Sequence, residues 1–227
     1  MPIKKLTSEI IFPPVENADE QGIVAFGGDL SPARLIEAYK SGIFPWFSEG
    51  DPIIWWSPDP RFVLFPEELK ISKSMRQVLN RNIFEIRLDT DFVSVIEGCR
   101  NPRKRQRGTW ITDEMKNAYI ELHTMGYAHS AESWINGRLA GGLYGIAIGK
   151  CFFGESMFTL EPNASKAAFI TLVKRLYSLG FLIIDCQVYT NHLESLGAEE
   201  ISRDDFIAII KEGLSHESIT GSWTGLL

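Results

Sequence analysis

The sequence predicts a mixed α/β fold of the α+β type, with a small N-terminal domain ahead of a larger C-terminal one. The chain has 227 residues, of which 44% are hydrophobic and 23% charged, and these are ordinary values for one large or two small globular domains. Residues 1–62 are rich in Pro, Gly and Trp, whereas residues 63–227 alternate between strand and helix patterns. A strand–helix–strand unit near the end of the chain implies a parallel pair with a right-handed crossover.

In the first domain, one helix is clearly marked. Ser31 is a suitable N-cap, Pro32 suits the first helical position, and Gly42 follows the last turn. The segment 43–60 then reads as an aromatic loop with short strands, because its prolines prevent a long helix. Two uses are open for its three tryptophans: packing in a core, or stacking on a nucleobase.

In the second domain, turn and cap signals divide helices from strands. Thr112 is a suitable N-cap for a helix that ends at Gly126, and Asn136-Gly137 is a strong two-residue hairpin signal. Gly180 ends a further helix. The expected order is helix, strand, helix, a meander of three strands, helix and strand, at residues 72–81, 84–88, 112–126, 131–135, 138–148, 151–158, 164–179 and 181–188.

A basic block lies within an acidic chain. The whole sequence has 23 Lys or Arg against 29 Asp or Glu, but residues 70–107 hold ten of the cations and only four of the acids. Lys73 and Arg76 lie on one face of the helix predicted at 72–81, with Arg81 to one side, and the loop 100–107 carries five cations. Two interpretations are open: a solvated surface, or a footprint for a phosphate backbone.

Polar residues interrupt two apolar strands of the second domain. Asp185 and Gln187 are expected on one face of the strand 181–188, about 7 Å apart, and Glu155 lies in the preceding strand beside Gly154. Burying a carboxylate or an amide is costly without partners. If the two strands are neighbours, the three side chains face one another in a cleft. A structural hydrogen-bond network is the alternative to a reactive site.

Several classes of protein are not supported by the sequence. The three cysteines are widely spaced without a C-x-x-C pair, and no His, Cys and carboxylate cluster has metal-ligand spacing, so we expect no metal and no cofactor. No apolar run reaches the length of a membrane span, and the N-terminus does not resemble a secretion signal, so a cytoplasmic protein is expected. His123 and His129 are interpreted as surface or cap groups, and His192 either lines the mouth of the cleft or is structural.

A series of motifs closely resembles the bacterial leucyl/phenylalanyl-tRNA–protein transferases. The resemblance spans about residues 9–210 and implies a small N-terminal domain (1–62) and an acetyltransferase-like, GNAT-type catalytic domain (63–227). It is carried, in order, by Phe26-Gly-Gly-Asp-Leu-Ser31, Gly42-Ile-Phe-Pro-Trp-Phe47, Trp55-Trp-Ser-Pro-Asp-Pro-Arg61, Gly108-Thr-Trp-Ile111, Gly154-Glu-Ser-Met-Phe158, Asn163-Ala-Ser-Lys166, Ile184-Asp-Cys-Gln187 and His192-Leu-Glu-Ser-Leu-Gly-Ala198.

The resemblance implies transfer of Leu or Phe, and Met less readily, from aminoacyl-tRNA to the N-terminal Arg or Lys of a protein, which is thereby marked for N-end rule degradation. The enzyme is expected to be a monomer. The reaction is ester aminolysis, and the attacking α-amine has an ordinary pKa of about 7.7–8.0, so orientation supplies much of the catalysis. Asp185 is the expected group that positions and deprotonates the amine. Gln187 would orient it or contact the oxyanion, and Glu155 would bind the donor's amino group or the acceptor's cation.

The same resemblance assigns binding residues. Leu143, Phe152 and Met157 match the apolar pocket for the transferred side chain, Trp46 and Trp110 flank the terminal adenosine and its amino acid, and Lys73, Arg76 and Arg81 match a tRNA-binding patch. Three rivals stay open. One is a coenzyme A-dependent acyltransferase, although residues 160–166 lack a Gly-rich pyrophosphate loop. The others are a cell-wall transferase that uses aminoacyl-tRNA, and a non-catalytic RNA-binding module.

Overall fold

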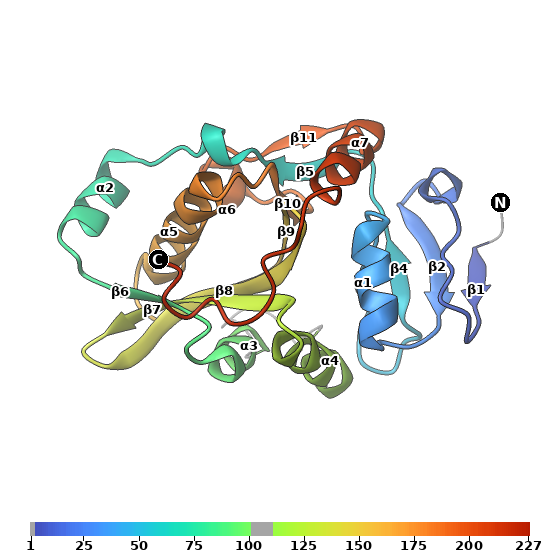
Figure 1. Ribbon diagram of the computed structural model, residues 1–227, viewed down its shortest axis with the longest axis horizontal. Coiled ribbons are helices and arrows are strands. Elements are labelled where there is room, and N and C mark those ends of the chain that lie inside the picture. Colours follow the sequence, from blue (N-terminus) through green and yellow to red (C-terminus); the bar gives the residue numbers. More distant parts are fainter. Residues whose placement is uncertain (1–2, 101–110) are drawn as a thin grey trace.

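The computed structural model describes residues 3–100 and 111–227 and has two β-sheets with helices packed around them (Figure 1). The smaller sheet lies at the N-terminal end of the molecule, beside the larger sheet. The prediction of a mixed α/β fold is therefore confirmed. None of the described helices is long and apolar enough to cross a membrane.

The smaller sheet has the strand order β1-β2-β4-β3 and is covered by helix α1. As predicted, α1 (Pro32–Lys40) begins with proline, and Gly42 follows it with a φ of 72°. Ser31 occupies the N-cap position, but its side chain makes no cap hydrogen bond. The strands and the first 3-10 helix are β1 (Lys4–Leu6), η1 (Val15–Asn17), β2 (Ile23–Gly27), β3 (Phe44–Pro45) and β4 (Ile54–Trp56).

The larger sheet has seven strands in the order β11-β5-β10-β9-β8-β7-β6. The Asn136-Gly137 hairpin is confirmed, with φ values of 50° and 71°. The strands are β5 (Arg61–Leu64), β6 (Glu85–Leu88), β7 (Ala128–Ile135), β8 (Arg138–Ile148), β9 (Cys151–Thr159), β10 (Ile183–Gln187) and β11 (Glu199–Ile201).

Helices cover both faces of this sheet. Helices α3 and α4 pack on one face and α5 on the other (Figure 1). The helices are η2 (Pro66–Glu68), α2 (Lys73–Asn80), α3 (Phe92–Arg100), α4 (Asp113–Thr124), α5 (Ala164–Ser178), α6 (Asn191–Glu194) and α7 (Arg203–Gly213). Helix α3 was not predicted from the sequence, because its valines and isoleucine have low helix propensity and only tertiary packing favours a helix there.

The predicted parallel pair is formed by β9 and β10, with α5 as its crossover. Their pairing runs only from Ile183↔Cys151 to Asp185↔Phe153. Beyond that point β9 has a bulge opposite Gly145, and β10 has an irregularity between Asp185 and Gln187 in its pairing with β5. The two strands therefore separate at their C-terminal ends, and the sheet opens between them.

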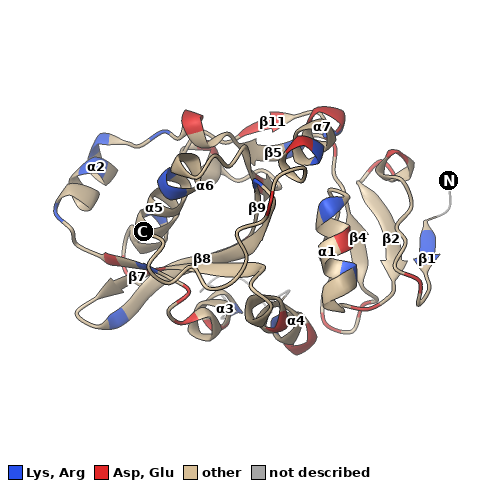
Figure 2. Ribbon diagram, in the orientation of Figure 1, with Lys and Arg blue, Asp and Glu red and all other residues tan. Residues whose placement is uncertain are grey.

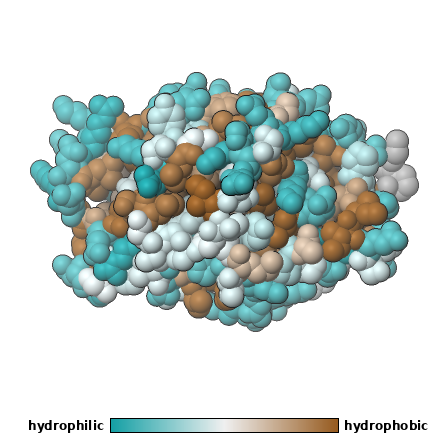
Figure 3. Space-filling view, in the orientation of Figure 1, coloured by the Kyte–Doolittle hydropathy of each residue, from teal (hydrophilic) through white to brown (hydrophobic). Residues whose placement is uncertain are grey.

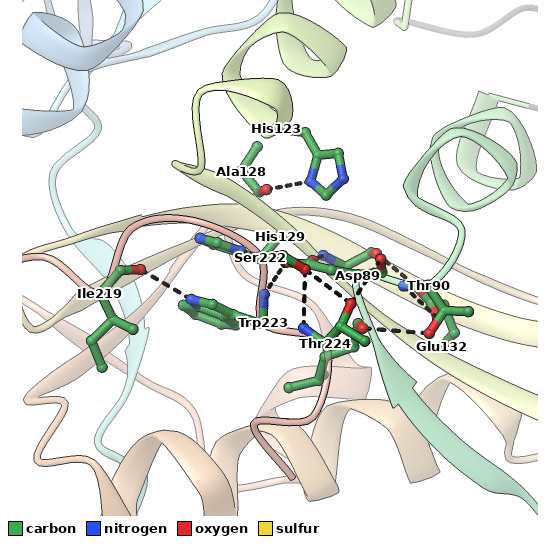
Figure 4. A network of polar contacts seen from close by, with 12 residues as sticks. Asp89, Thr90, His123, Ala128, His129, Glu132, Ile219, Ser222, Trp223 and Thr224 are labelled. Atoms are coloured by element: carbon green, nitrogen blue, oxygen red, sulfur yellow. Dashed lines mark hydrogen bonds and ion pairs between the residues drawn. The ribbon is translucent and has the colours of Figure 1, made fainter.

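The C-terminal segment is anchored on the sheet by a buried polar network (Figure 4). The ring of Trp223 stacks on His129 at 3.7 Å, and its backbone N–H donates to Asp89 Oδ2 at 2.8 Å. The same carboxylate oxygen lies 2.8 Å from His129 Nδ1. The prediction that His129 is a surface or cap group was wrong: the side chain is buried, and burial lowers its pKa. His123 is half-buried and does not cap its helix: its ring stacks on Phe92 at 4.2 Å, and its Nδ1 is hydrogen-bonded to the carbonyl of Ala128 in β7.

Replacing Asp89 with asparagine is expected to lower the free energy of unfolding by about 1–3 kcal/mol. The carboxylate accepts the N–H groups of Ser130 and Trp223 besides its contact with His129, and an amide has only one accepting oxygen. Urea unfolding measures the change, with the exposed Asp51→Asn as a matched control expected to stay within about 0.5 kcal/mol. Equal stability of the two variants would contradict the anchoring role.

Candidate active site

A cavity of about 870 Å³ occupies the opening between β9 and β10. Residues 154–159 of the first strand and 184–188 on and after the second line it, together with the first turn of α5 and residues from α3 and α6. Gly154 leaves backbone space at the point where the strands separate. The site is thus a consequence of the broken register.

The carboxylate of Glu155 is held by three donors from three different elements. Tyr39 on α1 donates its hydroxyl proton to Oε1 at 2.7 Å, and Tyr119 on α4 donates to Oε2 at 2.8 Å. Gln187 Nε2 donates to Oε1 at 2.9 Å. The prediction that Glu155 and Gln187 approach each other is confirmed by this contact.

Opposing effects set the charge of this carboxylate. Burial raises the pKa of Glu155 to about 7, although the hydrogen bonds from Tyr39, Tyr119 and Gln187 act to lower it. Burial and the nearby Glu155 raise the pKa values of both tyrosines well above 10, so their hydroxyls stay protonated and act as donors. Glu155 therefore exchanges its proton near neutral pH.

Asp185 is engaged in a buried ion pair. Arg61 Nε donates to its Oδ1 at 2.8 Å and Arg61 Nη2 to its Oδ2 at 2.6 Å, while both side chains are almost fully buried. Oδ1 also accepts the backbone N–H of Gln187 at 2.9 Å. The Asp185 carboxylate is thus paired with Arg61 inside the protein. Its expected role, to position and help deprotonate the substrate amine, stays a prediction.

Gln187 ends β10 in an unusual backbone conformation. Its φ is 64°, a left-handed value that costs a non-glycine residue roughly 1–3 kcal/mol and persists only where the surroundings hold it. The Asp185 carboxylate supplies that restraint through the Gln187 N–H. Asp185 and Gln187 are therefore coupled, but through the backbone and not as two side chains on one regular strand face.

The apolar wall of the cavity includes two of the three residues expected there. Leu143 and Met157 line it, together with Phe169 and Ile184. Phe152 is not among the lining residues: it lies in the hydrophobic cluster under α5, where its ring is 6.3 Å from that of Trp223. Phe152 pairs with Ala147 and Ile184, in the part of β9 that precedes the bulge and still pairs with β10.

Trp46 and the cations of α2 are not among the residues that line the cavity. Trp46 is 44% exposed, and its ring centroid is 5.8 Å from that of Trp56. Trp110 and most of the basic loop 100–107 fall outside the described residues. Lys73, Arg76 and Arg81 are exposed on and just after α2, at the end of the molecule opposite the N-terminus (Figure 2). His192 lines the cavity, as one of its two interpretations anticipated.

Three residues of the site were missed by sequence reasoning. They are Tyr39, Tyr119 and Arg61. Tyr39 belonged to the apolar stripe of its helix, which predicts a core residue, and Arg61 ended a motif without any visible partner. No cluster of three His, Cys, Asp or Glu side chains with metal-binding geometry occurs in the described parts of the chain.

Comparison with known proteins supports an enzyme that transfers aminoacyl groups. The model of the leucyl/phenylalanyl-tRNA protein transferase family matches residues 63–211, and the model of that family's N-terminal domain matches residues 28–59. The leucyl/phenylalanyl-tRNA–protein transferase of Syntrophus aciditrophicus is 55% identical over 225 residues, covering 99% of this chain and 94% of the relative. That of Myxococcus xanthus is 52% identical over 227 residues, covering 99% and 97%.

A solved structure of a conserved protein of unknown function from Staphylococcus epidermidis gives a TM-score of 0.42 at 9% identity, over 79% of this chain and 68% of that one, which is too low to support a conclusion about the fold. The sequence matches are decisive. The chain is an aminoacyltransferase. It belongs to the leucyl/phenylalanyl-tRNA protein transferase family.

Proposed function

We propose that the chain transfers Leu or Phe, and Met less readily, from aminoacyl-tRNA to the N-terminal Arg or Lys of acceptor proteins, marking them for N-end rule degradation. The observation that carries this proposal is the Glu155 carboxylate, which lies at the wall of an apolar cavity, is bonded to Gln187, and has a pKa of about 7. A base with that pKa is matched to an amine that must lose a proton near neutral pH.

In this proposal the acceptor's α-amine attacks the ester carbonyl of the donor. The C–N bond forms, the bond from the carbonyl carbon to the ribose oxygen breaks, and the amine's proton passes through Glu155 to that oxygen. The amide nitrogen of Gln187 donates a hydrogen bond to Glu155, so its amide oxygen is the atom that accepts from the amine and orients it. Asp185 acts through Gln187, as a positioning group, because its charge is paired with the buried guanidinium of Arg61 and its Oδ1 accepts the Gln187 N–H. The three donors to Glu155, by contrast, are uncharged.

Selectivity for the transferred amino acid and selectivity for the acceptor follow from different parts of the cavity. Leu143, Met157 and Phe169 offer an apolar surface to the transferred side chain, and the thioether chain of methionine adapts to both Leu and Phe shapes. The negative charge of Glu155 favours an acceptor whose first residue is cationic. Trp46, and Trp110 outside the described residues, remain the candidates for stacking on the terminal adenosine.

The domain division is part of the proposal. We propose a small domain of residues 1–62 and a catalytic domain of residues 63–227 with an acetyltransferase-like, GNAT-type fold. The smaller sheet ends at Trp56 and the larger sheet begins at Arg61, so the division between the sheets lies just before the proposed boundary, which β5 (Arg61–Leu64) spans. Hydrophobic and hydrophilic residues are mixed on the face shown in Figure 3. The proposal also keeps the expectation of a monomer. We place the enzyme in the cytoplasm, where aminoacyl-tRNA is found.

Replacing Lys73 and Arg76 together with glutamine is expected to weaken tRNA binding without changing kcat. The two side chains project from α2 into solvent, and each cation that contacts a phosphate contributes about 0.7–0.9 to the slope of log K against log salt. The slope should therefore fall by about 1.5. Binding titrations across a series of salt concentrations measure it, with the exposed pair Lys211 and Lys174 replaced in the same way as a control.

The proposed activity is tested with labelled Leu-tRNA and peptides that differ only at residue one. Label on peptides beginning with Arg or Lys, and none on those beginning with Ala, is the expected result. Transfer to coenzyme A or to a cell-wall precursor in place of the peptides would overturn the proposal in favour of another acceptor. Binding of tRNA with no transfer to any acceptor would overturn the proposal in favour of a non-catalytic RNA-binding module.

A further inference from the structure

We propose that the first turn of α5 binds a phosphate group of the donor RNA, namely the phosphodiester that precedes its terminal nucleotide. This inference rests on the proposed function, since it places the nucleotide end of the donor in the same cavity as Glu155 and Gln187. The first turn of α5 opens on that cavity: Asn163, Ser165 and Lys166 all line it.

Two backbone N–H groups of this turn are available to a ligand. The N–H of Ala164 donates to the Glu161 carbonyl at 3.1 Å, and that of Ala167 to the Asn163 carbonyl at 2.9 Å. For the N–H groups of Ser165 and Lys166 there is no acceptor among residues 3–100 and 111–227. The N-cap side chain usually accepts one of these protons, but Asn163 makes no such bond.

Ser165 supplies the second, independent indication of a ligand. The residue is only 7% exposed, it borders the cavity, and no described residue forms a hydrogen bond with its hydroxyl. Its neighbour in space shows the contrast: Ser133 is also buried, and its hydroxyl donates to the Ala164 carbonyl at 2.7 Å. The Ser165 hydroxyl is therefore open to a group bound in the cavity.

The turn is held in place before any ligand arrives. A Cβ atom on Gly141 would lie 2.8 Å from Ala164 Cβ and 3.1 Å from the Ser165 nitrogen, so the glycine in β8 allows the helix start to approach the sheet closely. The bond from Ser133 fixes the same turn to β7. Donors that are fixed in advance bind an anion with little loss of conformational entropy.

The chemistry of these donors selects a phosphate. Two backbone N–H groups at a helix N-terminus, one hydroxyl and the ammonium of Lys166 all present positive charge or protons, and the helix dipole adds to them. Lys166 is half-buried and forms no ion pair with any described residue. A cavity of about 870 Å³ holds a ligand as large as an aminoacyl nucleotide.

Helix α2, with its exposed cations, packs against α5, so the RNA continues from this phosphate toward Lys73 and Arg76.

Two non-reacting donor analogues test the inference: 3′-deoxy-3′-(leucylamino)adenosine, with and without a 5′-phosphate. Calorimetry at low ionic strength should show that the phosphate strengthens binding to the wild-type chain by about tenfold or more. In Lys166→Met and Ser165→Ala the gain should fall below about threefold, while binding of the analogue without phosphate stays unchanged. Lys174→Met, an exposed lysine further along the same helix, is the matched control and should keep the full gain.

Equal binding of the two analogues to the wild-type chain, or a gain that survives in both cavity variants, would overturn the inference. Transfer of Leu from Leu-tRNA to an Arg peptide is measured on the same preparations. Transfer without any gain from the phosphate would overturn the phosphate site and leave the proposed function standing. Absence of both transfer and binding of either analogue would overturn both.

Discussion

Replacing Glu155 with glutamine is expected to lower kcat by about 10²–10⁴-fold, the usual contribution of a general base. The amide has the same size as the carboxylate, and its oxygen still accepts a hydrogen bond from Tyr39 or Tyr119, so the cavity retains its shape. It cannot take up the proton of the amine. Steady-state transfer to an Arg peptide measures the effect, and binding of Leu-tRNA should be unchanged.

The pH dependence of the transfer rate tests directly whether Glu155 is the base. In the wild-type chain the rate should rise with pH through about 7, where Glu155 loses its proton. Tyr119→Phe removes a hydrogen bond that lowers this pKa, so the rise should move to higher pH. The peptide's own amine titrates equally in every assay, and a difference between variants therefore belongs to the enzyme. A profile that is the same for wild type and Tyr119→Phe would contradict the role of Glu155 as the base.

Ionised Glu155 should lower the free energy of unfolding. The folded-state pKa of Glu155 lies above its ordinary value of 4.5, so the folded chain binds this proton more tightly than the unfolded chain does. Its contribution is therefore most favourable below about pH 4.5 and is lost as pH rises to about 7. At pH 8, Glu155→Gln should be more stable than wild type by roughly 1–3 kcal/mol, an upper range because Glu155 is partly exposed to the cavity. Urea unfolding at pH 5 and pH 8 measures this, with the exposed Glu121→Gln as control.

The parts of this structure that the sequence predicted depend on local signals. The hairpin at Asn136-Gly137 follows from two residues that accept positive φ, and the crossover through α5 follows from one strand–helix–strand unit. Glu155 and Gln187 were paired because each is a polar residue in an apolar strand, and neighbouring strands bring such residues together.

The parts that were missed depend on contacts between distant segments. Tyr39 and Glu155 are 116 residues apart, and Arg61 and Asp185 are 124 apart. An aromatic residue on an apolar helix stripe has the same pattern whether or not its hydroxyl meets a carboxylate. His129 was misread for a similar reason, because its partner Asp89 lies in a turn forty residues upstream. Tertiary packing decides which polar groups pair across the sheet. A single sequence has no local signal for such long-range pairs.

Replacing Arg61 with methionine is expected to lower the free energy of unfolding by about 3–5 kcal/mol. The loss arises because Asp185 remains buried as an unpaired charge. The guanidinium also lies over the rings of Phe44 at 4.7 Å and Phe206 at 4.5 Å, which methionine contacts only as an apolar chain. As a control, Arg87→Met breaks a surface pair with Glu85 and should cost no more than about 1 kcal/mol.

The double variant Arg61→Met with Asp185→Leu separates stability from function. Removing both charges should restore most of the lost stability, since an apolar pair of similar volume often replaces a buried ion pair without cost. Transfer should nevertheless stay at least about a hundredfold below wild type, because the Gln187 N–H has lost the acceptor that holds its left-handed backbone. Chemical unfolding and the transfer rate are measured on both variants. A double variant that is stable and fully active would show that Asp185 serves the fold alone, and that Gln187 keeps its position without it.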